Sequence, residues 1–523
     1  MPMIKNPILR GFNPDPSICR AGDDFYIATS TFEWYPGVQI HHSTDLANWR
    51  LVRRPLNRAS LLDLTGVPDS CGVWAPCLSY EGGIFWLCYT VVTRFDGDFK
   101  DTHNFLTWSP KIEGDWSDPI PMNSSGFDPS LFHDGDGRKW HLNMVWNHRP
   151  DHSYFGGIVM QEYSHKQRRL IGDRKIIFKG TATGITEGPH LYKRGDYYYL
   201  MTAEGGTGCN HAITLARSKN IWGPYEVDPD LHIMTARDKP GANLQRTGHG
   251  SIVEDKQGQW CMAHLCSRPL SGLQRSPLGR ETALQKVNWA DDGWLRLSEP
   301  ETAYDAGNTG ELQDITYDFS EDGLHPDFQW LRVPDTSGLF SLSERKGALR
   351  VFGRDSIGSL FHSALVARRQ QHFNYEATTV LEYSPTDFQQ MAGLVAYYNA
   401  HKFHYLHLTY DDNRGRVLQI MSCLGDRTLG VTYPSKSTVG AVPATGKIWL
   451  KVRIGEAQLQ FSWSADGRDW NSVGGELDAS ILSDEAGKGD GANFTGAFVG
   501  MACQDLTGQR LPADFTQFRY REL

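Results

Sequence analysis

The 523-residue sequence lacks any apolar run of about 18 residues, the length that a membrane-spanning helix requires. Its first residues, 1–7, lack the apolar core of a secretory signal peptide. It also lacks a long run of Lys or Arg, and its net charge is -9. These absences argue against nucleic acid and membranes as partners, and they predict a soluble, cytoplasmic protein.

Cysteine pairs with the spacing of metal ligands are missing as well. The nine cysteines are scattered, none stands in a Cys-x-x-Cys arrangement, and several lie in apolar runs such as 86–89. This pattern predicts buried free thiols in a reducing compartment, and it argues against a disulfide framework or a structural zinc site. A Gly-rich loop with a Lys is also absent, which argues against a phosphate site.

Amphipathic helical patterns are nearly absent, and β-branched and aromatic runs broken by Gly, Asp and Asn take their place. A chain of 523 residues exceeds one ordinary core and therefore predicts two domains. Aromatic residues make up 12% of the chain. Aromatic faces stack on sugar rings, but they also fill β-sheet cores, so composition alone leaves both uses open.

A repeated pattern occupies roughly the first 300 residues. Five segments each contain a short element that is followed by a strand-like aromatic run. The elements open at Asp15, Ala75, Asp128, Glu187 and His249, and the runs span 24–27, 84–87, 138–141, 197–200 and 259–262. A repeat of about 55–60 residues suits a four-stranded β-unit, and five such units predict a five-bladed β-propeller.

Equivalent positions of the five units should lie at one depth around one axis. Asp15, Asp128, Glu187, His249 and Trp74 are therefore expected to converge at one end of the central channel. Neighbouring carboxylates repel each other, so at least one should have a raised pKa, as general acid–base catalysis requires. Taken singly, Asp before Pro is a common turn residue and a lone His is more often a core residue. A catalytic function is favoured because these acidic residues fall at equivalent positions of the repeated units.

A second domain follows a polar, Gly-containing linker at 300–313. Alternating strands are predicted at 348–352, 375–383, 404–410, 449–454 and 458–463. Such alternation is typical of an antiparallel β-sandwich. We therefore expect a propeller over 1–306 and a sandwich over 307–523. The sandwich is interpreted as a structural domain that covers one face of the propeller, with a lectin-like sugar module as the alternative.

Several motifs resemble those of β-xylosidases of glycoside hydrolase family 43. They lie at 13–17, 26–34, 72–76, 186–191, 201–206 and 278–282, with further matches at 389–394 and 494–500. The similarity runs nearly end to end. It implies an all-β fold, a five-bladed β-propeller followed by an antiparallel β-sandwich.

The resemblance implies an inverting, exo-acting β-1,4-xylosidase that releases xylose from the non-reducing ends of xylo-oligosaccharides. It implies Asp15 as the general base, Glu187 as the general acid, and Asp128 as the carboxylate that raises the pKa of Glu187 and orients the substrate. It also implies a set of substrate contacts, with the last residue reaching into the mouth of the site from the sandwich. These are Arg280, Phe32, Trp74, Trp146, His249 and Phe494.

Other functions stay open at this point. An α-L-arabinofuranosidase, as sole or second activity, is the nearest alternative. A retaining enzyme of the fructan type and a non-catalytic sugar-binding propeller are further alternatives. The loop 271–276 is shorter than in related enzymes, and we expect it to border the pocket and open the site toward longer or branched substrates.

No obligatory cofactor and no metal ligand set are expected, because no loop of the EF-hand type is present. The resemblance allows a Ca²⁺ ion that is bound through waters near His249. It also favours a homodimer or homotetramer. The expected partners are a xylo-oligosaccharide or an arabinoside substrate.

Overall fold

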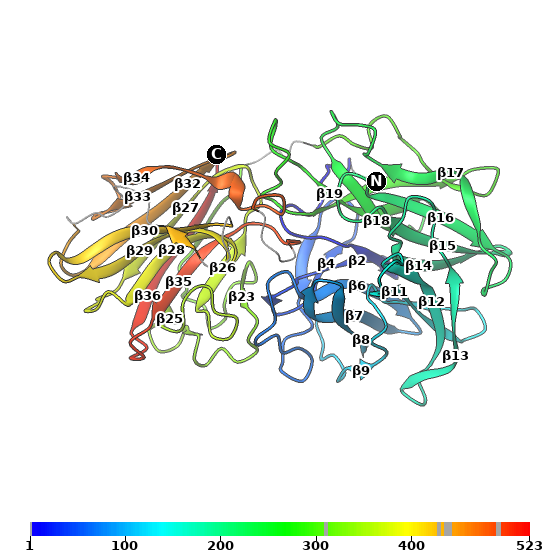
Figure 1. Ribbon diagram of the computed structural model, residues 1–523, viewed down its shortest axis with the longest axis horizontal. Coiled ribbons are helices and arrows are strands. Elements are labelled where there is room, and N and C mark those ends of the chain that lie inside the picture. The colour runs from blue at the N-terminus through cyan, green and yellow to red at the C-terminus, as the bar shows by residue number, and fades with distance from the viewer. Residues whose placement is uncertain (1–2, 308–311, 426–429, 433–441, 488–492) are drawn as a thin grey trace.

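The computed structural model describes residues 3–307, 312–425, 430–432, 442–487 and 493–523. Figure 1 shows two β-rich bodies side by side, with the N-terminal half of the chain in one and the C-terminal part in the other. Within these ranges the helical structure is a single 3-10 turn, η1 (Ala479–Ile481). The predicted all-β class is confirmed.

Five antiparallel four-stranded sheets form the first body, which confirms the predicted five-bladed propeller. The first blade contains β1 (Ser17–Ala21), β2 (Asp24–Thr29), β4 (Gln39–Ser43) and β5 (Arg50–Arg53), and the second contains β6 (Gly72–Glu81), β7 (Ile84–Asp96), β8 (Phe99–Ser109) and β9 (Ile120–Pro121). The third contains β10 (Ser130–His133), β11 (Lys139–Trp146), β12 (Phe155–Ser164) and β13 (Arg169–Phe178). The fourth contains β14 (Glu187–Arg194), β15 (Tyr197–Glu204), β16 (Ala212–Ser218) and β17 (Glu226–Thr235), and the fifth contains β18 (Gln245–Glu254), β19 (Trp260–Ser267), β20 (Glu281–Trp289) and β21 (Leu295–Leu297).

The predicted aromatic runs lie on the second strand of each blade. Their rings pack against the following blade at four successive interfaces, where aromatic pairs add to the burial of apolar area. The pairs are Tyr26 with Phe85, Trp86 with Tyr163, Trp140 with Trp222 and Tyr199 with Trp289, with ring centroids 5.2, 6.5, 5.0 and 4.6 Å apart. The repeat in the sequence is therefore a repeat of blade-to-blade packing.

The N-terminal segment joins the fifth blade to the first. The backbone of Leu9 pairs with that of Thr282 on β20, and the Asn6 side chain donates to the carbonyl of Leu284. Further along, the Asn13 N–H donates to the carbonyl of Arg280. These contacts hold the segment that leads to Asp15 against the fifth blade.

Among the described residues, two eight-stranded sheets form the second body, which confirms the predicted β-sandwich. One contains β22 (Asp314–Tyr317), β24 (Phe340–Ser341), β25 (Leu349–Phe352), β27 (Asn374–Glu382), β32 (Lys447–Gly455), β33 (Gln458–Ser464), β34 (Asn471–Asp478) and β36 (Pro512–Glu522). The other contains β3 (Trp34–Tyr35), β23 (Phe328–Leu331), β26 (Leu365–Arg369), β28 (Gln390–Asn399), β29 (Lys402–Asp411), β30 (Gly415–Leu424), β31 (Val431–Thr432) and β35 (Phe498–Asp505). The predicted domain boundary at 306/307 stays a prediction, and residues 308–311 of the predicted linker lie outside the described residues.

The two bodies share a sheet. Strand β3, which precedes β4 of the first blade, pairs with β23 of the sandwich. The Trp34 ring stacks on Phe498 of β35, with centroids 3.6 Å apart. This buried contact fixes the sandwich beside the segment that carries Phe32.

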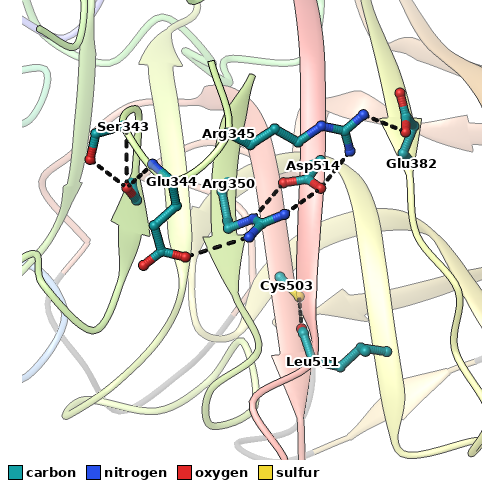
Figure 2. A network of polar contacts seen from close by, with 9 residues as sticks. Ser343, Glu344, Arg345, Arg350, Glu382, Cys503, Leu511 and Asp514 are labelled. Carbon is teal, nitrogen blue, oxygen red and sulfur yellow. Dashed lines mark hydrogen bonds and ion pairs between the residues drawn. The ribbon is translucent and has the colours of Figure 1, made fainter. Parts of the chain in front are cut away.

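A network of ion pairs links β25, β36 and β27, three neighbouring strands of the sheet that does not contain β3 (Figure 2). Asp514 on β36 accepts hydrogen bonds from Arg350 on β25 and from Arg345. The Arg345 guanidinium also donates to Glu382 at the end of β27. The network lies on the sandwich and shares no residue with the cavity described below.

No disulfide joins any of the nine cysteines, all of which lie in the described part of the chain. Cys209 is exposed and the others are buried, largely as predicted. The described residues include no helix with the length and apolar character needed to cross a membrane.

Candidate active site

The inner ends of the blades surround a cavity of about 170 Å³. All nine residues that the sequence singled out line it: Asp15, Phe32, Trp74, Asp128, Trp146, Glu187, His249, Arg280 and Phe494. They come from all five blades and from the sandwich. The predicted convergence of the acidic residues is therefore observed.

The backbone takes the left-handed conformation at equivalent points of several blades. Asp15, Asp128 and His249 have φ of 55°, 54° and 50°. Asp tolerates this region better than most residues because its short polar side chain bonds locally. In the fourth blade Gly188, with φ of 57°, takes this place, and Glu187 lies one residue before it. The predicted register was thus wrong by one residue at Glu187.

Asp15 is held in its charged form. Its carboxylate accepts hydrogen bonds from Arg280 Nη1 at 2.7 Å and from Ser30 Oγ at 2.6 Å, and His249 Nδ1 lies 3.7 Å away. Burial alone would raise the pKa of Asp15, but Arg280, His249 and Ser30 outweigh it and lower the pKa below its ordinary value. A buried carboxylate of this kind can accept a proton from water.

The pKa of Glu187 is shifted in the opposite direction, upward. Burial and Asp15 raise its pKa, Lys100 and Arg280 oppose them, and the pKa comes to about 7. Burial and the Glu187 carboxylate also raise the pKa of Asp128 well above its ordinary range, although Asp128 accepts the Gly188 N–H at 3.0 Å. Two carboxyl groups that repel in this way hold one proton between them near neutral pH. The Gly188 N–H stabilises the ionised form of Asp128 and so opposes part of this rise in its pKa.

Lys100 is a member of the site that the sequence did not reveal. It lies on β8, and its ammonium group is 3.6 Å from the Trp146 ring centroid and 4.1 Å from that of Phe95. Phe127 and Trp74 lie farther out, at 5.2 and 5.7 Å. Burial lowers the pKa of Lys100 to about 8, against the pull of the nearby carboxyl groups. Lys100 is on the second hairpin of its blade, where no repeated motif marks it.

The sandwich supplies one wall of the cavity. The Phe494 ring lies 5.6 Å from Trp74 and 6.3 Å from Phe32, centroid to centroid. Its backbone N–H donates to Ser70 Oγ, and its carbonyl accepts from Arg280 Nη2 at 3.2 Å. The same guanidinium therefore contacts the predicted base and the sandwich wall.

Two histidines also line the cavity. His249 was predicted, whereas His211 was not. The His211 Nδ1 lies 3.2 Å from the carbonyl of Arg246, while its buried Nε2 has no partner among the described residues. In the described part of the chain, no group of three or more His, Cys, Asp or Glu side chains is arranged to hold a metal ion. These residues do not fit a directly coordinated metal, and the water-bound Ca²⁺ near His249 stays a prediction.

The short loop 271–276 does not border the cavity, so that expectation was wrong. None of its residues lines the cavity, and the loop instead docks on the sandwich. Arg275 donates to Ser480 Oγ, and the Ser276 N–H donates to Glu485. These polar contacts hold the loop on the sandwich.

Comparison with known proteins agrees with this geometry. Residues 4–295 match glycosyl hydrolases family 43, and residues 316–521 match the Beta xylosidase C-terminal Concanavalin A-like domain. The chain is 54% identical to "Xylosidase/arabinosidase 43B" of Humicola insolens, over 100% of this chain and 98% of that protein. It is 49% identical to the "Beta-xylosidase" of Bacillus subtilis, over 99% of both chains.

Among solved structures, xylan beta-1,4-xylosidase from Bacillus Halodurans C-125 superposes with a TM-score of 0.94 at 49% identity. The match covers 99% of this chain and 100% of that one. Two domain matches and full-length identity at this level show that the chain belongs to glycosyl hydrolase family 43.

Proposed function

We propose that the protein is an inverting, exo-acting β-1,4-xylosidase that releases xylose from the non-reducing ends of xylo-oligosaccharides. One observation carries the proposal. A single cavity contains a carboxylate whose pKa is lowered, Asp15, and a carboxyl group whose pKa is raised to about 7, Glu187. Two acids with pKa values pushed apart are what general acid–base hydrolysis of a glycoside requires.

In the proposed mechanism, Asp15 takes a proton from a water that attacks the anomeric carbon. Glu187 gives its proton to the departing glycosidic oxygen in the same step. Arg280 keeps Asp15 charged before the reaction. Repulsion between Asp128 and Glu187 keeps these two carboxyl groups from both being ionised at the same time. The attack comes from the face opposite the leaving group, so the anomeric configuration inverts.

The size of the cavity supports cleavage at a chain end. Its volume of about 170 Å³ is below the roughly 300–1,000 Å³ of clefts that enclose drug-sized ligands. Phe494 closes one side against Phe32 and Trp74. A space of this size with aromatic walls favours one terminal pentose ring over an internal stretch of polysaccharide.

Two variants on two substrates test the acid and base assignments. Glu187→Ala should still cleave aryl xylosides with good leaving groups, because they need little proton donation, and should lose xylobiose cleavage. Asp15→Ala should lose both substrates, because the attacking water needs the base in either case. Equal loss of aryl xyloside cleavage in the two variants would contradict the assignments.

A second activity on α-L-arabinofuranosides is the alternative. The relative from Humicola insolens, whose name joins xylosidase and arabinosidase, is what favours it. D-xylopyranose and L-arabinofuranose present similar hydroxyl groups, so one pocket can accept both. Rates on the two 4-nitrophenyl glycosides, measured with the same enzyme, separate a sole activity from a dual one.

The proposal includes no obligatory cofactor. Activity should survive dialysis against EDTA. A loss of activity in EDTA that Ca²⁺ restores would instead support the predicted ion near His249. A dimeric or tetrameric assembly and a cytoplasmic location also stay predictions.

A further inference from the structure

A second cavity, of about 480 Å³, lies where the propeller meets the sandwich. It shares no lining residue with the catalytic cavity. Its described lining contains five cationic side chains and one carboxylate, Asp327. The cations are Lys5, Arg10 and Arg54 from the propeller, and Arg368 and Arg369 from the end of β26. We call this space the arginine cavity.

The arginines at its centre are held by neutral oxygen atoms. Arg54 donates through Nε and Nη2 to Gln39 Oε1, at 3.0 and 2.5 Å. Arg369 donates to the carbonyl of Phe12 at 2.6 Å and to the side chain of Gln329. A buried guanidinium is normally paired with a carboxylate, because an uncompensated buried charge is costly.

Several buried nitrogen atoms of side chains that line this cavity lack a partner. Arg369 is 6% exposed and Arg368 is 2% exposed. The Nη2 of Arg369, the Nε of Arg368 and the Nδ1 of His41 are buried without a hydrogen bond to any described residue. The unpaired donors of Arg368 and Arg369 are free to bond an acceptor that the described residues do not supply.

The single carboxylate does not balance the charge. Asp327 accepts a hydrogen bond from the Tyr317 hydroxyl and lies 3.9 Å from Arg368 Nη1. Burial lowers the pKa of Arg54 to about 9, and burial and Arg54 lower the pKa of Arg369 well below its ordinary value. Five cationic side chains against one carboxylate leave the lining with an excess of positive charge that a bound anion would offset.

We propose that the arginine cavity binds a phosphate group, either as inorganic phosphate or on a small phosphorylated molecule. Guanidinium groups match the oxygens of phosphate in forked pairs, and a dianion with several acceptor oxygens suits three arginines and their unpartnered donors. The volume leaves room for more than the phosphate group alone. The sequence lacks a Gly-rich phosphate loop, and the site is assembled instead from segments far apart in the chain.

The arginine cavity lies at the contact between the two bodies, so a bound anion would affect that contact. The Gln39 amide that holds Arg54 also donates to Asn13 Oδ1 at 2.7 Å, and Arg369 contacts Phe12. Phe12 and Asn13 both lie just before Asp15 in the sequence. A bound anion would join β26 of the sandwich to the segment that carries the proposed base, and so stabilise the contact between the two bodies.

The test uses the full-length protein and sodium phosphate. Isothermal titration calorimetry should show saturable binding, and the Tm should rise by roughly 2–4 °C in phosphate over sodium chloride of equal ionic strength. Glucose 6-phosphate, with glucose as its control, tells the two sources apart: tighter binding than phosphate supports a phosphorylated molecule, and weaker binding supports inorganic phosphate. Equal Tm values in phosphate and chloride, with no saturable heat, would overturn the proposal.

Two variants locate the site. Arg369→Gln and Arg54→Gln should each weaken phosphate binding at least 10-fold, whereas Arg174→Gln, on an exposed part of β13, should bind as the wild type does. If Arg369→Gln does not fold, Arg54→Gln on the propeller side decides alone. Phosphate binding that persists unchanged in the folded arginine variants would contradict the assigned site.

Discussion

Arg280 joins Asp15 to Phe494 through the two ends of one guanidinium group. Its Nη1 donates to the Asp15 carboxylate at 2.7 Å, and its Nη2 donates to the Phe494 carbonyl at 3.2 Å. The buried Nε has no partner among the described residues. The arginine therefore sets the charge of the proposed base and the position of the sandwich wall together.

Arg280→Met should move the acidic limb of the kcat/KM profile to higher pH. The Arg280 charge lowers the pKa of Asp15, so its loss raises that pKa and the base becomes protonated at a higher pH. Loss of a charge-assisted hydrogen bond of about 1.5–3 kcal/mol predicts a fall in kcat/KM of roughly 10- to 150-fold. Arg345→Met, in the network of Figure 2, is the control and should leave the profile in place. An unchanged acidic limb in Arg280→Met would show that Arg280 does not control Asp15.

Lys100→Met should move the alkaline limb to higher pH. The Lys100 charge lowers the pKa of Glu187, so without it Glu187 stays protonated, and active, at higher pH. Lys193→Met is a matched control, because Lys193 also lies 3.6 Å from a ring centroid, that of Tyr198, outside the cavity. A pH–rate series on an aryl xyloside measures both variants, and a shift of the alkaline limb to lower pH would contradict the expected sign.

Phe494→Ala should lower kcat/KM by roughly 10- to 100-fold, chiefly by raising KM. The ring contributes aromatic contacts worth about 0.5–1.5 kcal/mol each, and its loss opens one wall of the cavity. Phe388→Ala, at a sandwich residue that is 60% exposed, controls for the loss of a phenyl ring. Wild-type kinetics in Phe494→Ala would show that the sandwich does not take part in substrate binding.

Gly188→Ala should lower kcat at least 10-fold. A Cβ there would lie 2.9 Å from the His249 ring, and the left-handed conformation, with φ of 57°, adds about 1–2 kcal/mol of strain. Gly195→Ala is the matched control: its φ is 54°, but a Cβ would meet nothing within 4 Å. Thermal unfolding should show a small loss in Gly195→Ala and a larger one in Gly188→Ala, and only the folded Gly188→Ala protein should lose activity. Equal activities would mean that the clash with His249 is relieved without disturbing the site.

The propeller could be predicted because one packing requirement recurs along the chain. The aromatic second strand of a blade packs on the next blade at four successive interfaces, and this repetition gives the sequence its period. The repeat also indicated Asp15, Asp128, Glu187, His249 and Trp74 as site residues, whereas the others were implied by the family resemblance. The carboxyl groups of Asp15 and Asp128 follow because they occupy equivalent positions before the first strands of their blades.

Other features of the structure leave no repeated pattern in the sequence. Lys100 is recruited through the aromatic rings around it, which come together only in the folded structure. The pairing of β3 with the sandwich and the docking of loop 271–276 are contacts between distant segments, with no local pattern to reveal them. The one-residue offset of Glu187 arises because Gly188 takes the left-handed position in its blade.

The anomeric form of the first product tests the central claim most directly. Proton NMR during early hydrolysis of a β-xyloside, before mutarotation, should show α-xylose, because a water activated by Asp15 attacks from the face opposite the leaving oxygen. Release of β-xylose as the first product would contradict this account, since it would require one of the carboxylates to act as a nucleophile.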